Sequence, residues 1–243
     1  MLSANGIRAI LFDMDGTLRH NRPSYPDTFF NIATRLGAPD VRENRWRAAR
    51  WLHYYWANSN ELVSDQAIYT DQVEAFWTNH ARLFLSALGC IPEQAAALAP
   101  LAYQHMNEEY KPQDWVPADV PETLRVLKEA GYKLAVLSNR LQPFLEQLEN
   151  LGLSSYFEFA LHAGKVEAWK PDPEIFLHAT DQIGAQPGEA VYVGDNYYAD
   201  VIGSSRAGLI PVLIDPDGLF PEAECAVIRK IGDLPEMLIN HVV

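Results

Sequence analysis

Two acidic residues separated by one position, Asp13 and Asp15, directly follow the apolar run 9–12 and precede Gly16 and Thr17. A buried strand that ends in Asp-x-Asp places two carboxylates where open α/β sheets bind their ligands. Carboxylates this close repel each other unless a cation or a shared proton lies between them. A solvated turn also uses Asp and Gly, so the interpretation depends on the rest of the chain.

Three further groups of polar residues follow predicted strands or lie just beyond them. They are Ser138 and Asn139 after the apolar run 133–137, Lys170 before a proline-marked helix start, and Asp195 after the run 190–193, with Asp200 shortly behind. Each group alone is typical of a turn or a surface charge. Because the carboxyl ends of parallel strands meet at one edge of a sheet, we expect all four groups to converge on one crevice.

The residue types in this crevice suit phosphoryl transfer. Asp13 and Asp195 offer hard oxygen ligands of the kind that Mg²⁺ takes together with waters and a substrate phosphate. Lys170 is a point charge suited to phosphate. Ser138, Thr17 and local backbone N–H groups can donate hydrogen bonds to phosphoryl oxygens.

The paired carboxylates suit a two-step reaction. One Asp carboxylate can act as a nucleophile through an aspartyl-phosphate intermediate. A second carboxyl group, Asp15, can then protonate the leaving alkoxide and later activate water.

The elements that position these residues are strands alternating with amphipathic helices. Predicted strands are 9–12, 133–137, 157–161, 190–193 and 210–214, and predicted helices are 121–130, 143–151, 173–183 and 200–207. This alternation favours parallel pairing through right-handed crossovers, and the continuous apolar strands indicate a sheet covered on both faces. We therefore predict a doubly wound, Rossmann-like α/β sheet of five parallel strands.

Residues 19–115 interrupt this alternation. Strand signals are absent, and long helical stretches rich in Trp, Tyr, Arg and Ala cover 42–58, 69–88 and 93–110, followed by a proline-marked linker at 111–117. We expect an all-helical domain at 19–115, inserted into a catalytic core of 1–18 and 116–243.

The order DMDGT, LSN, WKPDP and GDNYYAD resembles the four motifs of the haloacid dehalogenase superfamily of hydrolases, and the helical insertion is similar to that family's cap. The resemblance implies that Asp13 is the nucleophile and a Mg²⁺ ligand. It implies that Asp15 is the general acid and base, with its backbone carbonyl also on the metal. The remaining implied roles are Thr17, Ser138, Asn139 and Lys170 for the phosphoryl group and its charge, Asp195 for the metal, and Asp200 as an outer carboxylate that orients the site.

The resemblance leaves several activities open, of which a Mg²⁺-dependent phosphatase acting on a small phosphorylated metabolite is favoured. The family's dehalogenases typically lack the second carboxylate, because a halide needs no proton, and Asp15 is present here. The family's phosphonate cleavage uses a cap lysine, and residues 19–110 contain no lysine. A phosphomutase with the same carboxylates and a non-catalytic binding protein on this fold remain alternatives.

The candidates for substrate specificity are weaker. One predicted helix of the insertion gathers Trp46, Arg47, Arg50, Trp51, His53, Tyr54, Tyr55 and Trp56. These residues suit an aromatic-walled pocket with Arg50 for an anionic group, although packing of the helix on its neighbours is the favoured explanation of the aromatic residues. Arg19, His20 and Arg140 lie beside the first two motifs and are candidates for contact with the leaving group, although solvated side chains explain them equally well. The histidines His53, His80 and His105 lack metal-binding spacing and are expected to be structural.

Composition limits the partners. The net charge of −13 argues against a nucleic acid or an anionic membrane, because both need a basic footprint. Residues 1–8 lack the pattern of a signal peptide, and no apolar run approaches the ~20 residues of a membrane helix. Two distant cysteines, Cys90 and Cys225, indicate reduced thiols and a cytoplasmic setting. We expect a monomer or a homodimer.

Overall fold

The computed structural model describes residues 6–241 and has two compact units. Unit 1 contains the described residues up to His20 and from Val116 onward, and unit 2 is Asn21–Trp115. The outermost residues of the predicted core domain, 1–5 and 242–243, lie outside the described residues. Among the described helices, none combines the length and the apolar character needed to cross a membrane.

Unit 1 is built on a six-stranded parallel sheet of order β5-β4-β1-β6-β7-β8. The strands are β1 (Ala9–Phe12), β4 (Lys133–Ser138), β5 (Phe159–His162), β6 (Ala190–Gly194), β7 (Ile210–Ile214) and β8 (Ala226–Ile228). The doubly wound parallel sheet is confirmed. The predicted number of five strands is one too few, because β8 has three residues and follows β7 with no helix between them.

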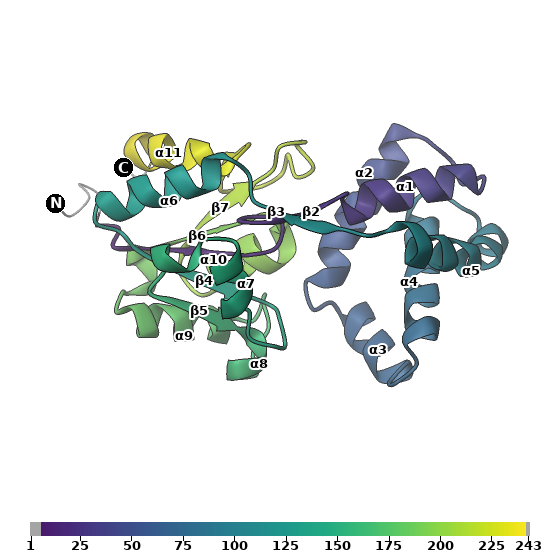
Figure 1. The fold of residues 1–243 in the computed structure, drawn as a ribbon, viewed down its shortest axis with the longest axis horizontal. Helices are drawn as coiled ribbons and strands as arrows, with labels where there is room; N and C mark the ends of the chain where they lie inside the picture. Colours follow the sequence, from purple (N-terminus) through teal and green to yellow (C-terminus); the bar gives the residue numbers. More distant parts are fainter. Residues whose placement is uncertain (1–5, 242–243) are drawn as a thin grey trace. The chain divides into compact units, whose positions relative to one another are not determined.

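Both faces of the sheet are buried, as the continuous apolar strands predicted. In β1, Ile10 and Phe12 belong to one apolar cluster, whereas Ala9 and Leu11 belong to the other. Helices α6 (Asp119–Glu129), α7 (Leu145–Asn150) and α11 (Leu234–His241) contribute to the first cluster, and α9 (Pro173–Ile183) to the second. Figure 1 shows α6 and α11 along one face and α9 along the other.

Helix α9 shows how local sequence sets the boundaries of an element that flanks the site. Asp172 caps its N-terminus by accepting a hydrogen bond from the backbone N–H of Glu174 at 3.0 Å. Pro173 occupies the first helical turn, and Gly184 ends the helix in the left-handed conformation with φ 71°. The prediction of a helix at 173–183 is therefore confirmed.

The predicted helix 200–207 is a π-helical turn (Tyr197–Val201) that continues into α10 (Ile202–Arg206). The π turn starts three residues earlier than predicted because Asn196 caps it, accepting from the backbone N–H groups of Tyr198 and Ala199. The other short elements of unit 1 are α8 (Ala163–Val166) and 3₁₀ turns at Ser154–Tyr156, Pro187–Glu189 and Ile231–Asp233.

Unit 2 is mainly helical. Its helices are α1 (Tyr25–Arg35), α2 (Arg42–Trp56), α3 (Asn60–Ile68), α4 (Val73–Ala87) and α5 (Pro92–Glu109). The description as all-helical is wrong in one respect: β2 (His20–Arg22) and β3 (Gln113–Trp115) pair in a two-stranded sheet. Each strand has only three residues, and its partner lies far away in sequence. The sequence pattern therefore predicts a linker at 111–117, where the structure has β3.

An aromatic cluster surrounds His80 in unit 2. The ring centroids of Tyr55, Trp51, Trp56, Trp77, Tyr25 and Phe84 lie 5.0–6.1 Å from that of His80. His80 Nδ1 lies 3.2 Å from Tyr25 Oη, and Nε2 has no hydrogen-bond partner among the described residues. Burial lowers the pKa of His80 to about 3. His80 is therefore a neutral core residue.

We predict that acid destabilises this cluster through His80. The unfolded chain binds a proton at this position below pH ~6.5, whereas the folded chain does so only near pH 3, so stability falls as pH falls between these values. The His80→Phe variant keeps an aromatic ring but cannot bind this proton. Between pH ~6 and ~5 its free energy of unfolding should fall by about 1.4 kcal/mol less per pH unit than that of wild type.

Urea unfolding at several pH values checks this prediction. Tryptophan fluorescence is a suitable signal, because every tryptophan except Trp169 lies in unit 2. Parallel pH dependences in the two proteins would contradict it.

Candidate active site

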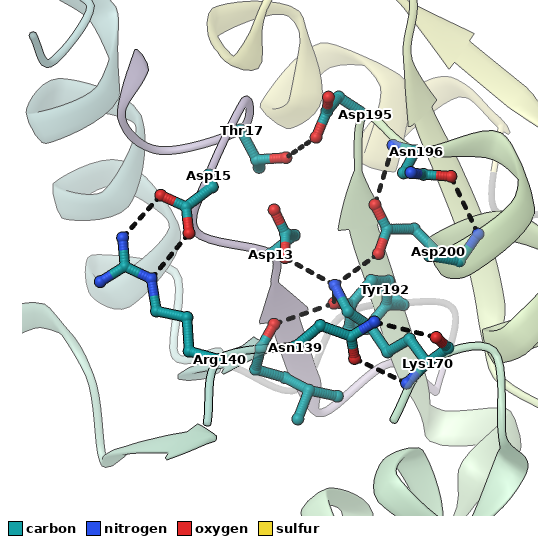
Figure 2. Close-up of polar contacts among 12 residues, drawn as sticks. Asp13, Asp15, Thr17, Asn139, Arg140, Lys170, Tyr192, Asp195, Asn196 and Asp200 are labelled. Carbon is teal, nitrogen blue, oxygen red and sulfur yellow. Dashed lines mark hydrogen bonds and ion pairs between the residues drawn. The ribbon is translucent and has the colours of Figure 1, made fainter. Parts of the chain in front are cut away.

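The ammonium group of Lys170 is buried at the centre of the polar cluster in unit 1. Its Nζ donates to Asp13 Oδ1 at 2.6 Å, to Asp200 Oδ1 at 2.6 Å and to Tyr192 Oη at 3.0 Å. The Tyr192 hydroxyl in turn donates to the carbonyl oxygen of Leu137 at 3.1 Å. Figure 2 shows the amine between the two carboxylates. All three donor positions of the ammonium are therefore used.

The order of the strands brings these residues together. β4, β1 and β6 are neighbours in the sheet, so their carboxyl ends deliver Ser138, Asp13 and Asp195 to one edge. The backbone N–H of Asp13 donates to the carbonyl of Val193 at 2.9 Å and so continues the pairing of β1 with β6. Ser138 is the last residue of β4 and is buried.

Asn139 connects the end of β4 to the segment that carries Lys170. Its Oδ1 accepts from the backbone N–H of Lys170 at 2.6 Å, and its Nδ2 donates to the carbonyl of the same residue at 2.9 Å. Asn139 therefore positions Lys170. Its predicted contact with substrate stays a prediction.

The second side of the cluster holds Asp195 and Asp200. Thr17 donates to Asp195 Oδ1 at 3.3 Å, and the backbone N–H of Asn196 donates to Asp200 Oδ2 at 2.9 Å. Two glycines make room for these carboxylates. A Cβ at Gly16 would lie 2.4 Å from Asp195 Oδ2, and one at Gly194 would lie 2.2 Å from Asp200 Oδ2. Gly16 also has φ +92°, which side chains rarely tolerate.

Asp15 points away from this cluster toward Arg140 (Figure 2). Arg140 donates from Nε to Oδ2 at 2.8 Å and from Nη2 to Oδ1 at 2.7 Å, and Arg19 Nη2 lies 2.7 Å from Oδ1. A tight turn brings Arg19 close to Asp15, because the backbone N–H of Gly16 donates to the carbonyl of Arg19 at 2.8 Å. The Asp15 side chain is 39% exposed. The two carboxylates of the first motif therefore occupy different environments.

Burial dominates the electrostatics of the cluster. It raises the pKa of Asp13 to about 7, against the opposing attraction of Lys170. Desolvation, followed by repulsion from Asp13, raises the pKa of Asp195 well above its usual range, although Asp195 keeps some solvent-accessible surface. For Lys170, burial favours the neutral amine, but attraction to Asp13 and Asp200 outweighs it and raises the pKa well above the ordinary value.

These residues fit a divalent cation. Asp13, Asp195 and Asp200 offer carboxylate oxygens within 4.8 Å of one another, and Lys170 supplies a single positive charge to all three. Buried carboxylates in such excess require protons or a cation, and an oxygen-only donor set suits Mg²⁺. Both oxygens of Asp200 already accept hydrogen bonds, so Asp13 and Asp195 are better placed to bind the ion directly.

The predicted site residues fall into two groups. Asp13, Thr17, Asn139, Lys170, Asp195 and Asp200 are joined by the contacts above, and Ser138 lies at the same edge of the sheet. The Asp15 carboxylate lies with the arginines, and its predicted backbone ligation stays a prediction. Arg50 is in α2 of unit 2, and its binding role also stays a prediction.

Tyr192 contributes to the site but was not among the residues predicted from the sequence. Tyr192 lies inside an apolar strand, and a buried tyrosine hydroxyl needs a hydrogen-bond partner. A tyrosine in such a strand therefore indicates a polar group nearby. Arg19 and Arg140 were candidates for contact with the leaving group or for solvation, and the side chains of both reach Asp15.

Comparison with known proteins identifies the relationships of the chain. A family model described as haloacid dehalogenase-like hydrolase matches residues 7–208. A glyceraldehyde 3-phosphate phosphatase of Methanopyrus kandleri is 34% identical over 97% of this chain and 94% of its own length. An (S)-2-haloacid dehalogenase of Burkholderia cepacia is 28% identical over 96% of this chain and 94% of its own. The crystal structure of a phosphatase from Thermococcus onnurineus aligns with a TM-score of 0.55 and 27% identity, covering 98% of this chain and 100% of that chain.

We predict that Lys170→Met destabilises the fold, because it leaves Asp13 and Asp200 buried without their shared cation. The free energy of unfolding at pH 7 should fall by about 3 kcal/mol or more. Adding Asp200→Asn removes one of the unpaired charges and should recover part of the loss.

Urea unfolding in the presence of a chelator measures both effects. Lys128→Met is the matched control, since this exposed lysine donates only to the carbonyl of Ser155 in the described structure and its loss should cost about 1 kcal/mol or less. Equal losses for Lys170→Met and Lys128→Met would refute the prediction.

Proposed function

The chain belongs to the haloacid dehalogenase-like hydrolases, and on that premise we propose that it is a Mg²⁺-dependent phosphatase of a small phosphorylated metabolite. The named phosphatases among its relatives support hydrolysis of a phosphoric monoester. The observation that carries the proposal is the separation of the two carboxylates of the first motif. Asp13 lies in the buried cluster beside Lys170, while Asp15 is partly exposed and held by arginines.

This separation suits two different tasks. Lys170 occupies Oδ1 of Asp13, and Figure 2 shows the other oxygen directed toward the side of Thr17 and Asp195. In the first step that oxygen attacks phosphorus, the ester bond breaks, and Asp15 gives a proton to the departing alkoxide. In the second step Asp15 takes a proton from water, whose oxygen attacks the phosphorus of the aspartyl-phosphate, so that the P–O bond to Asp13 breaks, inorganic phosphate leaves and the Asp13 carboxylate returns.

The neighbouring residues support both steps. Lys170, whose three donors are occupied by protein groups, offsets the charge of the phosphoryl group. The hydroxyl groups of Thr17 and Ser138 can donate hydrogen bonds to the phosphoryl oxygens. Asp13 and Asp195 would hold Mg²⁺, with Asp200 orienting Lys170 and the backbone of Asn196. When bound, the ion supplies charge stabilisation for the phosphoryl group and lowers the repulsion among the carboxylates.

Two other activities of the same family compete with this proposal. Likeness to a haloacid dehalogenase keeps dehalogenation as the second candidate, but an acid such as Asp15 has no task when halide leaves. A phosphomutase would use the same two carboxylates and would return the phosphoryl group to a second substrate hydroxyl.

The finer features of the proposal concern specificity and setting. We propose that residues 19–115 act as a cap domain, with Arg50 as a candidate contact for an anionic group of the substrate. The proposed setting is cytoplasmic, and the proposed assembly is a monomer or a homodimer that binds neither nucleic acid nor membranes.

The proposed activity is tested by a substrate panel under metal control. We expect phosphate release from p-nitrophenyl phosphate and from sugar or triose phosphates such as glyceraldehyde 3-phosphate, with no halide release from 2-chloropropionate. Excess chelator should abolish turnover, and added Mg²⁺ should restore it.

Asp195→Asn should raise the Mg²⁺ concentration needed for half-maximal activity by about tenfold or more. Asp181→Asn on the surface of α9 is the control and should leave it unchanged. Full turnover in chelator would exclude the metal dependence.

The proposed nucleophile is tested by Asp13→Asn, in which the amide is a poor nucleophile. Turnover should fall by about a thousandfold or more while the variant stays folded. Acid quenching of wild-type turnover followed by borohydride reduction should convert the acyl phosphate at Asp13 to homoserine, detected by peptide mass spectrometry. Absence of homoserine at this position during phosphate release would indicate direct attack by water on the ester.

A further inference from the structure

Arg140 forms a fork-shaped ion pair with Asp15. Its Nε and Nη2 donate to different oxygens of the carboxylate at 2.8 and 2.7 Å. Its Nη1 donates to Oε1 of Gln147, and its guanidinium carbon lies 5.4 Å from the ring centroid of Phe144. The guanidinium is therefore held on three sides, and two of its donors fix the plane of the Asp15 carboxylate.

The backbone that carries Arg140 is also fixed. The N–H of Gly164 donates to the Arg140 carbonyl at 3.1 Å. A Cβ at Gly164 would lie 2.1 Å from the carbonyl oxygen of Leu141, so this close approach requires glycine. The same carbonyl lies 3.1 Å from His162 Nδ1. Arg140 thus lies in a loop whose backbone is hydrogen-bonded to His162 at the end of β5 and to Gly164 in α8.

The two oxygens of Asp15 are held unequally. Among the contacts of the described residues, Oδ1 accepts from both Arg140 and Arg19, whereas Oδ2 accepts from Arg140 alone. A carboxylate oxygen has two lone-pair positions, so Oδ2 is the oxygen with capacity left for a proton. Arg19 makes this difference, because its ion pair is with Oδ1, whereas Arg140 contacts both oxygens and so holds the carboxylate in the orientation that leaves Oδ2 with this capacity.

We propose that Arg140 is a positioning residue for Asp15, holding the carboxylate so that Oδ2 exchanges the proton with the leaving group and with water. The inference rests on the proposed function, in which Asp15 is the general acid and base. It replaces the expected contact of Arg140 with the leaving group, since the fork is directed at Asp15 and the third donor at Gln147. Removing Arg140 therefore harms the reaction only through Asp15.

A double-mutant cycle with Asp15→Asn tests this dependence, using p-nitrophenyl phosphate and phenyl phosphate as probes. Phenoxide is the more basic leaving group and depends more on protonation. Arg140→Met should lower kcat for phenyl phosphate by about 10- to 100-fold with little change in KM. With p-nitrophenyl phosphate it should leave a rapid burst of product followed by slow turnover.

In the Asp15→Asn background the same substitution should cost less than about twofold, because residues that act as one unit are not additive. Arg140→Lys keeps the charge but loses the fork, so it should resemble Arg140→Met. Arg125→Met on α6, which removes an exposed arginine paired with Glu122 and Glu129, should leave kcat unchanged. Thermal unfolding checks that each variant is folded, and the Arg140→Lys cycle stands in if Arg140→Met is not.

Three outcomes overturn the inference while wild-type phosphatase activity stands. Equal losses from Arg140→Met with and without Asp15 would show that Arg140 acts directly on substrate. Full activity of Arg140→Lys would show that charge, rather than the fork, is needed. Wild-type rates for Asp15→Asn would remove the acid and base role, and with it the role of Arg140. Absence of metal-dependent phosphate release from wild type would instead reject the proposed function itself.

Discussion

The buried ammonium of Lys170 is the interaction on which the site of unit 1 depends. An ion with a 3% exposed side chain must be paired and hydrogen-bonded, because desolvation costs several kcal/mol. Its three partners come from the end of β1, from β6 and from the π turn after β6. Asn139 at the end of β4 holds its backbone. Satisfying one cation therefore fixes the relative positions of three neighbouring strand ends.

Close packing of charge also explains why the turns of the site contain glycine. The carboxylates of Asp195 and Asp200 press against Gly16 and Gly194 at distances that exclude a Cβ. The two carboxylates can occupy these places because the glycines have no side chain. The same reasoning applies to Gly164 beside Leu141. The glycines of the motifs thus leave the space that the acidic side chains occupy, and the proposed reaction depends on both.

Sequence patterns predicted elements whose signals are local. The strands of the sheet core are continuous apolar runs, and α9 carries its own cap, proline and terminal glycine. Elements with three residues, such as β2, β3 and β8, give no periodic signal, and their partners are distant in sequence. Helix α1 was not predicted, although Ser24 and Pro26 mark its start. Its 11 residues give a shorter helical pattern than the three long stretches of the insertion that were predicted.

The difference between Asp13 and Asp15 shows what sequence patterns do not contain. Two identical side chains, two positions apart in sequence, have opposite environments because the chain turns between them and directs one inward and the other outward. The inward group meets Lys170, and the outward group meets Arg140, which is 125 residues away in sequence. Residue types indicate that an acid and a nucleophile are available, but tertiary contacts assign the tasks. In the proposed reaction the ammonium of Lys170 favours the ionised form of Asp13 that attacks phosphorus, and it opposes burial, which raises the pKa of Asp13. Partial exposure and an unequal hold on its two oxygens suit Asp15 to exchange protons with solvent and leaving group.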